Sequence, residues 1–416
     1  MTALRPRFDQ STVLQVTAFL MLPFAVVFPL GIAALGATAA LFLIALALMG
    51  RKPGTIPAKP LVPLLALAVL WAAGSAFWSL EPARSLYLAA RLLAIAAGSV
   101  LMIGAAAHLA PEGRARVERA LIAGGFVALV LFAIEIVANA PADGFSFDPG
   151  RWRIALHAPH RTANVLTLIV WPLVLAAWSR RGPIWAGVTF AVAAVMLLLL
   201  ESSAPILAAA VALAVFVLAW WVPRITALVL AALTIAMLTV TPVMNNVAPA
   251  LSRFLTETGY VDPPAYHRLI IWSHVADLLI ERPVMGWGLD ATRFLGDNSA
   301  IVAVPSGLAG QTVNADQLPL HPHNAFLQIW LELGLPGALL LTAFVLLGIE
   351  RSVRLARSRE GRAACLAALG AGLVVGQLSF GVWQGWWQVT LWISAVLMIA
   401  MCQTGSPRPH LPEPGR

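Results

Sequence analysis

The side chains best suited to catalysis lie in one short polar stretch, His321-Pro322-His323-Asn324, directly before an apolar run. A neutral imidazole can act as a general base near neutral pH. We expect Asn324 to cap a helix that starts here, and the free backbone N–H groups of that helix disfavour a protonated His323. His323 is therefore our candidate base. The alternative is that His321 and His323 are polar residues framing a turn around Pro322 at a membrane boundary, and His321 is in either case a candidate supporting residue.

Gly334-Leu335-Pro336-Gly337 interrupts the apolar run that would otherwise continue from Phe326 to Leu347. Glycine is permissive of unusual backbone angles and proline lacks an N–H, so the pair predicts a break. The expected result is a short helix followed by a full membrane span. Broken helices at membrane depth border cavities, whereas close helix packing through small residues is the alternative for Gly334 and Gly337.

Arg161 and Arg268 each stand at the edge of a hydrophobic segment. A guanidinium there is costly unless it reaches water or meets an anion, and its forked donors match phosphate oxygens. Two arginines and a histidine at one membrane face suggest an anionic lipid head group, although snorkelling to water is the alternative for either arginine alone. The nearest carboxylates orient His323 or lie on a solvated helix face, and they are Asp277, Glu281 and Asp290.

The elements that must position these residues are membrane helices. Of 416 residues, 60% are hydrophobic and 11% are charged, far from the usual quarter charged of a soluble domain. The net charge of +8 is not gathered into a nucleic-acid-binding face. Cys365 and Cys402 both lie in apolar runs, so they support neither a disulfide framework nor a cysteine metal site. The first hydrophobic segment follows Arg5 and Arg7 and is expected to be retained as a span rather than removed as a signal.

About twelve apolar runs have the length of a membrane span, which needs roughly 20 helical residues. They lie near 12–28, 30–49, 60–78, 86–109, 119–139, 162–178, 183–200, 203–221, 225–242, 335–349, 363–380 and 385–402. With both termini in the cytoplasm, most of the 27 basic residues fall on the cytoplasmic side, as the positive-inside rule requires. The exceptions are Arg84, Arg91, Arg151, Arg153, Arg161, Arg253, Arg268, Arg282 and Arg293.

The predicted organisation is therefore an all-α polytopic membrane protein with one large periplasmic loop. Residues 1–242 hold nine spans and a short periplasmic segment, 140–161. Residues 243–322 form the large loop, in which the near-helical spacing of apolar residues predicts an interfacial helix near 264–282. Residues 323–402 hold the short motif helix and three spans, and 403–416 form a cytoplasmic tail.

Several signatures of other chemistry are missing from the sequence. There is no P-loop, dinucleotide fingerprint, HExxH zinc pattern or G-x-S-x-G elbow. An Asp-x-Asp pair that could hold a divalent cation and a nucleotide sugar is also absent. We therefore expect no metal and no cofactor.

Three groups of residues together resemble the O-antigen ligase and polymerase superfamily of membrane glycosyltransferases. His323-Asn324, nine residues, Gly334, two residues and Gly337 fit every position of its most recognisable pattern. Arg268, Trp272 and the segment 283–288 look like its motif in the large periplasmic loop, and His160 to Asn164 before Trp171-Pro172 is similar to its arginine at a central span. The aromatic stretch 380–387 also looks like one near the last span of some members.

This resemblance implies a metal-independent, inverting enzyme of the C-type glycosyltransferase kind in the bacterial inner membrane. It would take a glycan from undecaprenyl pyrophosphate on the periplasmic side and transfer it to lipid A-core. Arg161 and Arg268 would bind the pyrophosphate and His323 would be the base. A polymerase of the same superfamily, which joins lipid-linked repeat units, fits the motifs equally well. A membrane transporter with the arginines along its substrate path ranks below both.

Overall fold

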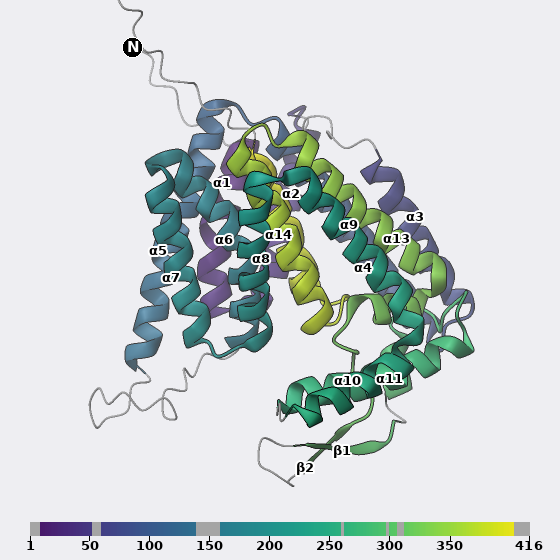
Figure 1. Cartoon of the computed structure of the whole chain (residues 1–416). Helices are drawn as coiled ribbons and strands as arrows, with labels where there is room; N and C mark the ends of the chain where they lie inside the picture. The colour runs from purple at the N-terminus through teal and green to yellow at the C-terminus, as the bar shows by residue number, and fades with distance from the viewer. Residues whose placement is uncertain are drawn as a thin grey trace, which may run out of the picture.

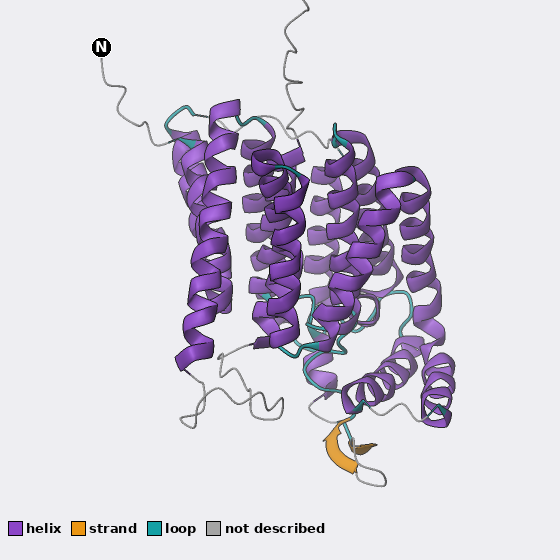
Figure 2. Cartoon of the chain, turned by 60° about the vertical axis from the view of Figure 1, so that its left-hand side comes forward, coloured by secondary structure: helices purple, strands orange, loops and turns teal. Residues whose placement is uncertain are grey.

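Long helices pack side by side into a bundle, and shorter elements gather at one end of it (Figures 1 and 2). The structure is a computed structural model and describes residues 9–51, 60–138, 159–258, 262–296, 299–305 and 312–402. The bundle helices are α1 (Gln10–Val27), α2 (Ile32–Leu48), α3 (Leu61–Gly74), α4 (Pro82–Ala107), α5 (Pro111–Ala138), α6 (Pro159–Arg181), α7 (Pro183–Leu199), α8 (Ser203–Trp221), α9 (Pro223–Val240), α13 (Ala325–Leu355), α14 (Arg359–Leu378) and α15 (Gly385–Cys402).

These twelve helices coincide with the twelve predicted apolar runs, and the multi-pass helical membrane fold is confirmed. In the described ranges, ten helical stretches are long and apolar enough to cross a membrane, and Leu61–Phe77 and Pro183–Leu199 are shorter apolar helices. That all twelve cross the bilayer stays a prediction. The cut expected at Pro29 is present, because a short 3₁₀ turn, η1 (Pro29–Gly31), separates α1 from α2.

Proline sets the start of several of these helices. Pro82, Pro183, Pro223 and Pro263 each stand at the first turn of a helix, where the missing N–H has no intrahelical partner to lose and the fixed φ already suits a helix. This placement explains why the helix bounds follow the sequence so closely. It also sets the lengths of the intervening turns.

Helix α6 is the most enclosed span, and its buried face runs from Thr162 to Ala177 with few interruptions. It contacts α1, α5, α7, α8, α14 and α15. Large apolar side chains of the outer helices stay exposed, among them Leu41, Leu70 and Leu228. An exposed apolar surface of this extent is the surface that lipid chains cover in a membrane protein.

Most arginines gather at one end of the bundle, called here the basic end. There Arg116 lies 3.5 Å from Asp9 at the start of α1, and Arg180 pairs with Glu118 at 2.9 Å. These contacts join the starts of α1 and α5 to the end of α6. The other arginines placed here by the helix ends are Arg51, Arg114, Arg119, Arg181, Arg224, Arg351, Arg354, Arg359 and Arg362.

The opposite end, called here the loop end, carries the elements between α9 and α13 (Figure 1). They are η3 (Thr241–Val243), α10 (Met244–Glu257), α11 (Pro263–Glu281), α12 (Ala291–Gly296), β1 (Ile301–Pro305) and β2 (Thr312–Asp316), with η2 (Ser75–Phe77) nearby in sequence after α3. The helix predicted near 264–282 is present as α11. Its position at a membrane interface stays a prediction.

Two features of the loop end were not predicted. Helix α10 follows α9 through the short turn η3, and β1 and β2 pair antiparallel with Val302 opposite Ala315. This small ribbon is the departure from an all-α chain. Of the predicted segment 140–161, only the start of α6 lies within the described residues, and the tail 403–416 lies outside them.

Candidate functional site

His323 lies at the loop end, directly before α13 begins. Its backbone φ of +54° is left-handed, a conformation that costs free energy in a non-glycine residue and is often found at functional sites. The next residue, Asn324, is the N-cap of α13, and its side chain accepts a hydrogen bond from the Leu327 N–H at 3.0 Å. The expected cap is therefore present.

The His323 ring is held by the backbone carbonyl of Ser379, which ends α14, through Nδ1. Because a carbonyl only accepts hydrogen bonds, Nδ1 must carry the proton, and Nε2 keeps its lone pair. Burial lowers the pKa of His323 below its ordinary 6.5, the Ser379 hydrogen bond opposes that change, and Arg268 and His267 lower the pKa further. The neutral imidazole with a basic Nε2 is the form that a general base needs.

His321 packs against His323 rather than pointing away from it. The two imidazole rings have centroids 4.3 Å apart in an edge-on arrangement. Burial, His323 and Arg293 lower the pKa of His321 to about 3, so it stays neutral. A Cβ at Gly381 would lie 2.9 Å from the His321 side chain, so only glycine there allows this contact. The contact with His323 is consistent with a supporting role for His321, and that role stays a prediction.

The turn that holds both histidines is tied to α11. The indole Nε1 of Trp272 donates to the carbonyl of Pro322 at 2.9 Å. Arg268 lies one helical turn before Trp272 on α11, and its charge acts on His323. His267 bonds the carbonyl of Asp316 at 2.8 Å and links α11 to β2. The charge of Arg268 thus reaches the His323 ring, and a joint action of the two side chains on one substrate stays a prediction.

The expected break occurs at Gly334, where φ is +66° and ψ is −169°. Backbone groups freed by such a break must find partners at membrane depth. The N–H groups of Trp287 and Gly288 donate to the carbonyls of Leu331 and Glu332 at 2.9 and 2.8 Å, and the Leu335 N–H donates to Pro283 at 3.0 Å. Hydrogen bonds with the segment 283–288 thus satisfy the backbone groups at the break. The motif that contains His323 and Gly334 and the motif of the large loop therefore pack together.

Glycines make this junction possible. A Cβ on Gly334 would lie 1.9 Å from the Val284 carbonyl oxygen, and one on Gly286 would lie 2.5 Å from the Glu332 oxygen. Gly337, on the far side of the break, sits against the Leu333 side chain, which a Cβ would approach to 2.4 Å. Close approach of a neighbouring backbone therefore accounts for Gly334 and Gly286, and the Leu333 side chain accounts for Gly337.

Sequence reasoning missed Glu332, a fully buried acid on the short helix before the break. Its Oε1 accepts from the Thr292 hydroxyl at 2.5 Å and the Gln328 amide at 3.1 Å. Its Oε2 accepts from the Asp290 N–H at 2.6 Å and the Trp383 indole at 2.5 Å. Two donors on each oxygen use the whole accepting capacity of a carboxylate. The signal in the sequence was an acid inside an apolar run, which is costly unless it is partnered.

The same network ties down the aromatic stretch after α14. Gln328 accepts from the Val382 N–H at 3.0 Å, and Arg91 of α4 donates to the carbonyl of Trp383. The stretch noted in the sequence as aromatic therefore packs on the motif helix. Its position explains how Ser379, just before it, is held against His323.

Among the described residues, none of the three carboxylates considered as partners for His323 makes a hydrogen bond or an ion pair with it. Asp277 accepts from Asn245 at 3.0 Å, and Asp290 pairs with Arg84 at 2.7 Å and with Arg293 at 3.7 Å. Among the described residues, the group that orients His323 is the Ser379 carbonyl. A backbone carbonyl leaves no signal in a sequence, which is why this partner could not be predicted.

Arg161 stands at the start of α6, and the structure places it at the loop end without a described contact to His323. A Cβ at Gly372 of α14 would lie 3.8 Å from Leu168 of α6. From that crossing, seven residues lead back to Arg161 and seven lead on to Ser379, which brings both to the same end. The Arg161 Nε is shielded and has no hydrogen-bond partner among the described residues. A joint role with Arg268 stays a prediction.

Within the described ranges, no three His, Cys, Asp or Glu side chains gather as a metal site requires. The expectation of metal-independent chemistry is not tested by that observation. It remains part of the proposal below.

The fold and site define a polytopic membrane protein with a polar centre built on a broken helix. The O-antigen ligase family model matches residues 188–342, a range that includes Arg268, His323, Gly334 and Gly337. This match confirms the resemblance to the O-antigen ligase family that the motifs predicted. At the level of the family, the function is that of a polysaccharide ligase-like, glycosyltransferase-like enzyme.

Similar proteins extend this likeness beyond the matched residues. A protein of Rickettsia conorii named "Putative polysaccharide ligase" is 27% identical over 310 residues, 72% of this chain and 71% of its own. Proteins of Rickettsia prowazekii and Rickettsia typhi with the same description are each 26% identical over 68% of this chain and 67% of their own.

Proposed function

We propose that this protein transfers a glycan from undecaprenyl pyrophosphate to lipid A-core, with inversion at the anomeric carbon and without a metal ion. The observation that carries the proposal is the neutral, shielded imidazole of His323 beside the charge of Arg268. A base and a cation at one membrane face suit the joining of an acceptor hydroxyl to a pyrophosphate-linked sugar. The match to the O-antigen ligase family supports the same class of reaction.

In the proposed step, His323 Nε2 takes the proton of the acceptor hydroxyl as its oxygen attacks the anomeric carbon. A new glycosidic C–O bond forms while the bond from that carbon to the pyrophosphate oxygen breaks. The electron pair leaves with the pyrophosphate, whose growing charge Arg268 and Arg161 stabilise through forked hydrogen bonds. Attack from the side opposite the leaving group inverts the anomeric centre.

A reconstituted reaction tests the chemistry. Purified protein in detergent, supplied with a lipid-linked glycan donor and a lipid A-core acceptor, should form glycosylated lipid A-core without added metal and in the presence of a chelator. Product of retained anomeric configuration, or a strict metal requirement, would contradict the mechanism. Movement of a solute into vesicles with no glycosidic product would favour a transporter instead.

The acceptor is tested separately in a deletion strain. A ligase deletion should lose both the long glycan chains and the single-repeat band from the lipopolysaccharide profile. A surviving single-repeat band would instead indicate a polymerase, whose acceptor is a second lipid-linked repeat unit. This result would leave the site chemistry intact and change only the acceptor.

A further inference from the structure

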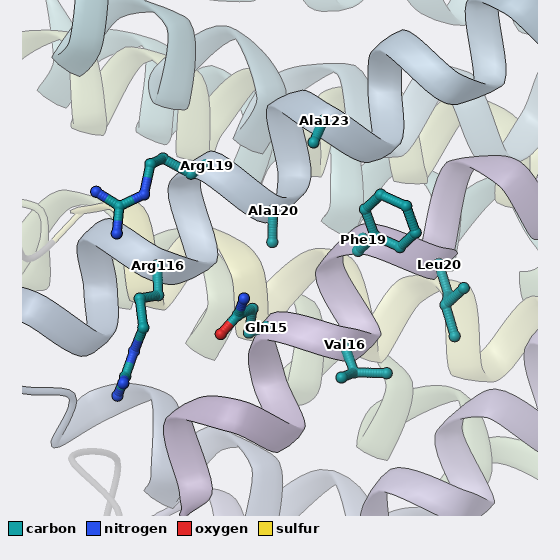
Figure 3. Close-up of a pocket in the computed structure, with 8 residues that line it drawn as sticks. All are labelled: Gln15, Val16, Phe19, Leu20, Arg116, Arg119, Ala120 and Ala123. Carbon is teal, nitrogen blue, oxygen red and sulfur yellow. The ribbon is translucent and has the colours of Figure 1, made fainter. Parts of the chain in front are cut away.

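A hollow of about 590 Å³ lies between α1 and α5 near the basic end of the bundle (Figure 3). It is called here the α1–α5 hollow, and its lining residues are Gln15, Val16, Phe19, Leu20, Arg116, Arg119, Ala120 and Ala123. The proposed transfer site is at the other end of the bundle. The hollow therefore needs an explanation of its own.

The sequence of α5 explains why space remains between two helices in close contact. A Cβ on Gly124 would lie 2.1 Å from the carbonyl oxygen of Phe19, so the two backbones nearly touch there. Ala120, one turn before Gly124, and Ala123, directly before it, line the hollow with only methyl groups (Figure 3). Tight contact at the glycine and short side chains beside it leave an open groove on the side of the bundle.

The walls of the hollow are apolar and face outward. Val16 is 48% exposed and Phe19 is 36% exposed. Both stand on a helix long and apolar enough to cross a membrane, as does α5. In a membrane-embedded bundle, such side chains face lipid acyl chains.

Two arginines close the end of the hollow nearer the start of α5 (Figure 3). The Arg119 side chain is exposed and has no hydrogen-bond or ion-pair partner within the part of the chain that the structure describes. Arg116 donates to the Ser11 hydroxyl and lies 3.5 Å from Asp9, and its Nε has no described partner. One carboxylate against two guanidinium groups leaves a net positive charge beside the apolar walls.

We propose that the α1–α5 hollow binds an anionic glycerophospholipid of the surrounding bilayer. Its phosphate lies between Arg116 and Arg119, and one acyl chain runs along Val16, Phe19 and Leu20. Guanidinium groups match phosphate oxygens in charge and geometry, and basic pockets between membrane helices recognise anionic head groups. A free anion would use only the charged end of the hollow, whereas a phospholipid also fills the apolar groove.

Native mass spectrometry of the full chain in detergent tests this proposal, with phosphatidylglycerol and phosphatidylcholine of the same acyl chains as probes. Wild-type protein should bind phosphatidylglycerol more tightly. Arg119→Gln should weaken phosphatidylglycerol binding about fivefold, the factor for about 1 kcal/mol per basic residue near a membrane surface. Arg224→Gln is the matched control, because Arg224 is exposed at the same end and is not among the residues that line the α1–α5 hollow. Its affinity should equal that of the wild type.

A second variant tests the apolar half with the charges intact. Ala123→Leu fills the groove and should reduce binding of both lipids, whereas Ala210→Leu, at an exposed alanine of α8, should not. Equal affinity for the two lipids, or equal losses in Arg119→Gln and Arg224→Gln, would overturn the proposal. Displacement of phosphatidylglycerol by inorganic phosphate at the same concentration would do so too, since it would show a bare anion site.

Discussion

The imidazole of His323 gains its suitability as a base from its burial and from two neighbours. The Ser379 carbonyl selects the tautomer, burial lowers the pKa of the ring, and the charge of Arg268 lowers that pKa further. The proposed base thus stays neutral and keeps Nε2 available. Each neighbour makes a different contribution, so each can be tested by a different measurement.

His323→Ala should lower kcat by roughly 10²- to 10⁴-fold, the usual contribution of general base catalysis. Donor binding should change little, because the ring carries no charge for the pyrophosphate. Rates in the reconstituted transfer reaction and donor affinity by direct binding give the two readings. His267→Ala is the comparison, since His267 bonds Asp316 and acts on His323 only through charge, so most of the activity should remain. Full activity of His323→Ala would exclude this residue as the base.

The pH profile tests the electrostatics at His323. Its pKa is lowered, so kcat/KM should fall only when the pH drops below the ordinary histidine value of 6.5, where the imidazole gains a proton. Arg268→Gln removes a positive charge that lowers this pKa. The acid limb of the Arg268→Gln profile should therefore move to higher pH, in addition to any loss of donor binding. If the acid limb did not move, Arg268 would not affect the pKa of His323 and would act only on the donor.

At the scale of elements, the helices were predictable and the contacts between them were not. Hydrophobic runs predicted the bundle helices, and the near-helical spacing of apolar residues predicted α11, because both signals are local in the chain. The partners of Glu332 come from residues 290, 292, 328 and 383, and no local pattern predicts such a meeting. The β1–β2 ribbon was missed for the same reason, since its pairing is a tertiary event.

Gly334→Ala should destabilise the protein strongly. The added methyl group would meet the Val284 carbonyl at 1.9 Å, and alanine is strained at a φ of +66°. Gly187→Ala in α7 is the matched control, because a Cβ there has nothing within 4 Å and alanine favours helix by roughly 0.5–1 kcal/mol. Thermal unfolding in detergent should show a clear loss of Tm for the first and no loss for the second. Equal Tm values would mean that the break tolerates a side chain.

Glu332→Gln should also destabilise the loop end. In glutamine, an NH2 group replaces one carboxylate oxygen and cannot accept hydrogen bonds. The two donors that faced that oxygen therefore lose their acceptor, at a cost of roughly 1–3 kcal/mol each. Thr292→Val removes a single donor to the same carboxylate and should cost less. Unfolding of both single variants and the double variant forms a cycle, and additive losses would show that the four donors do not act as one network.

The whole molecule carries its polar chemistry at the loop end and most of its arginines at the basic end. That separation is expected of a protein oriented in the inner membrane by the positive-inside rule, with the loop end in the periplasm. The predicted orientation has both termini in the cytoplasm. This orientation places His323 on the side where lipid-linked glycans would be joined to lipid A-core, so the proposed function requires this orientation.

Labelling of introduced cysteines tests this orientation in a background where Cys365 and Cys402 are alanine. Asn314→Cys places a thiol on exposed β2 at the loop end, and Arg354→Cys places one at the basic end, where the native side chain is 71% exposed. A membrane-impermeant maleimide should label position 314 in intact spheroplasts and position 354 only after permeabilisation. The reverse pattern would put His323 in the cytoplasm. A lipid-linked donor would then have to be used before export, and the proposed acceptor on the periplasmic side would be out of reach.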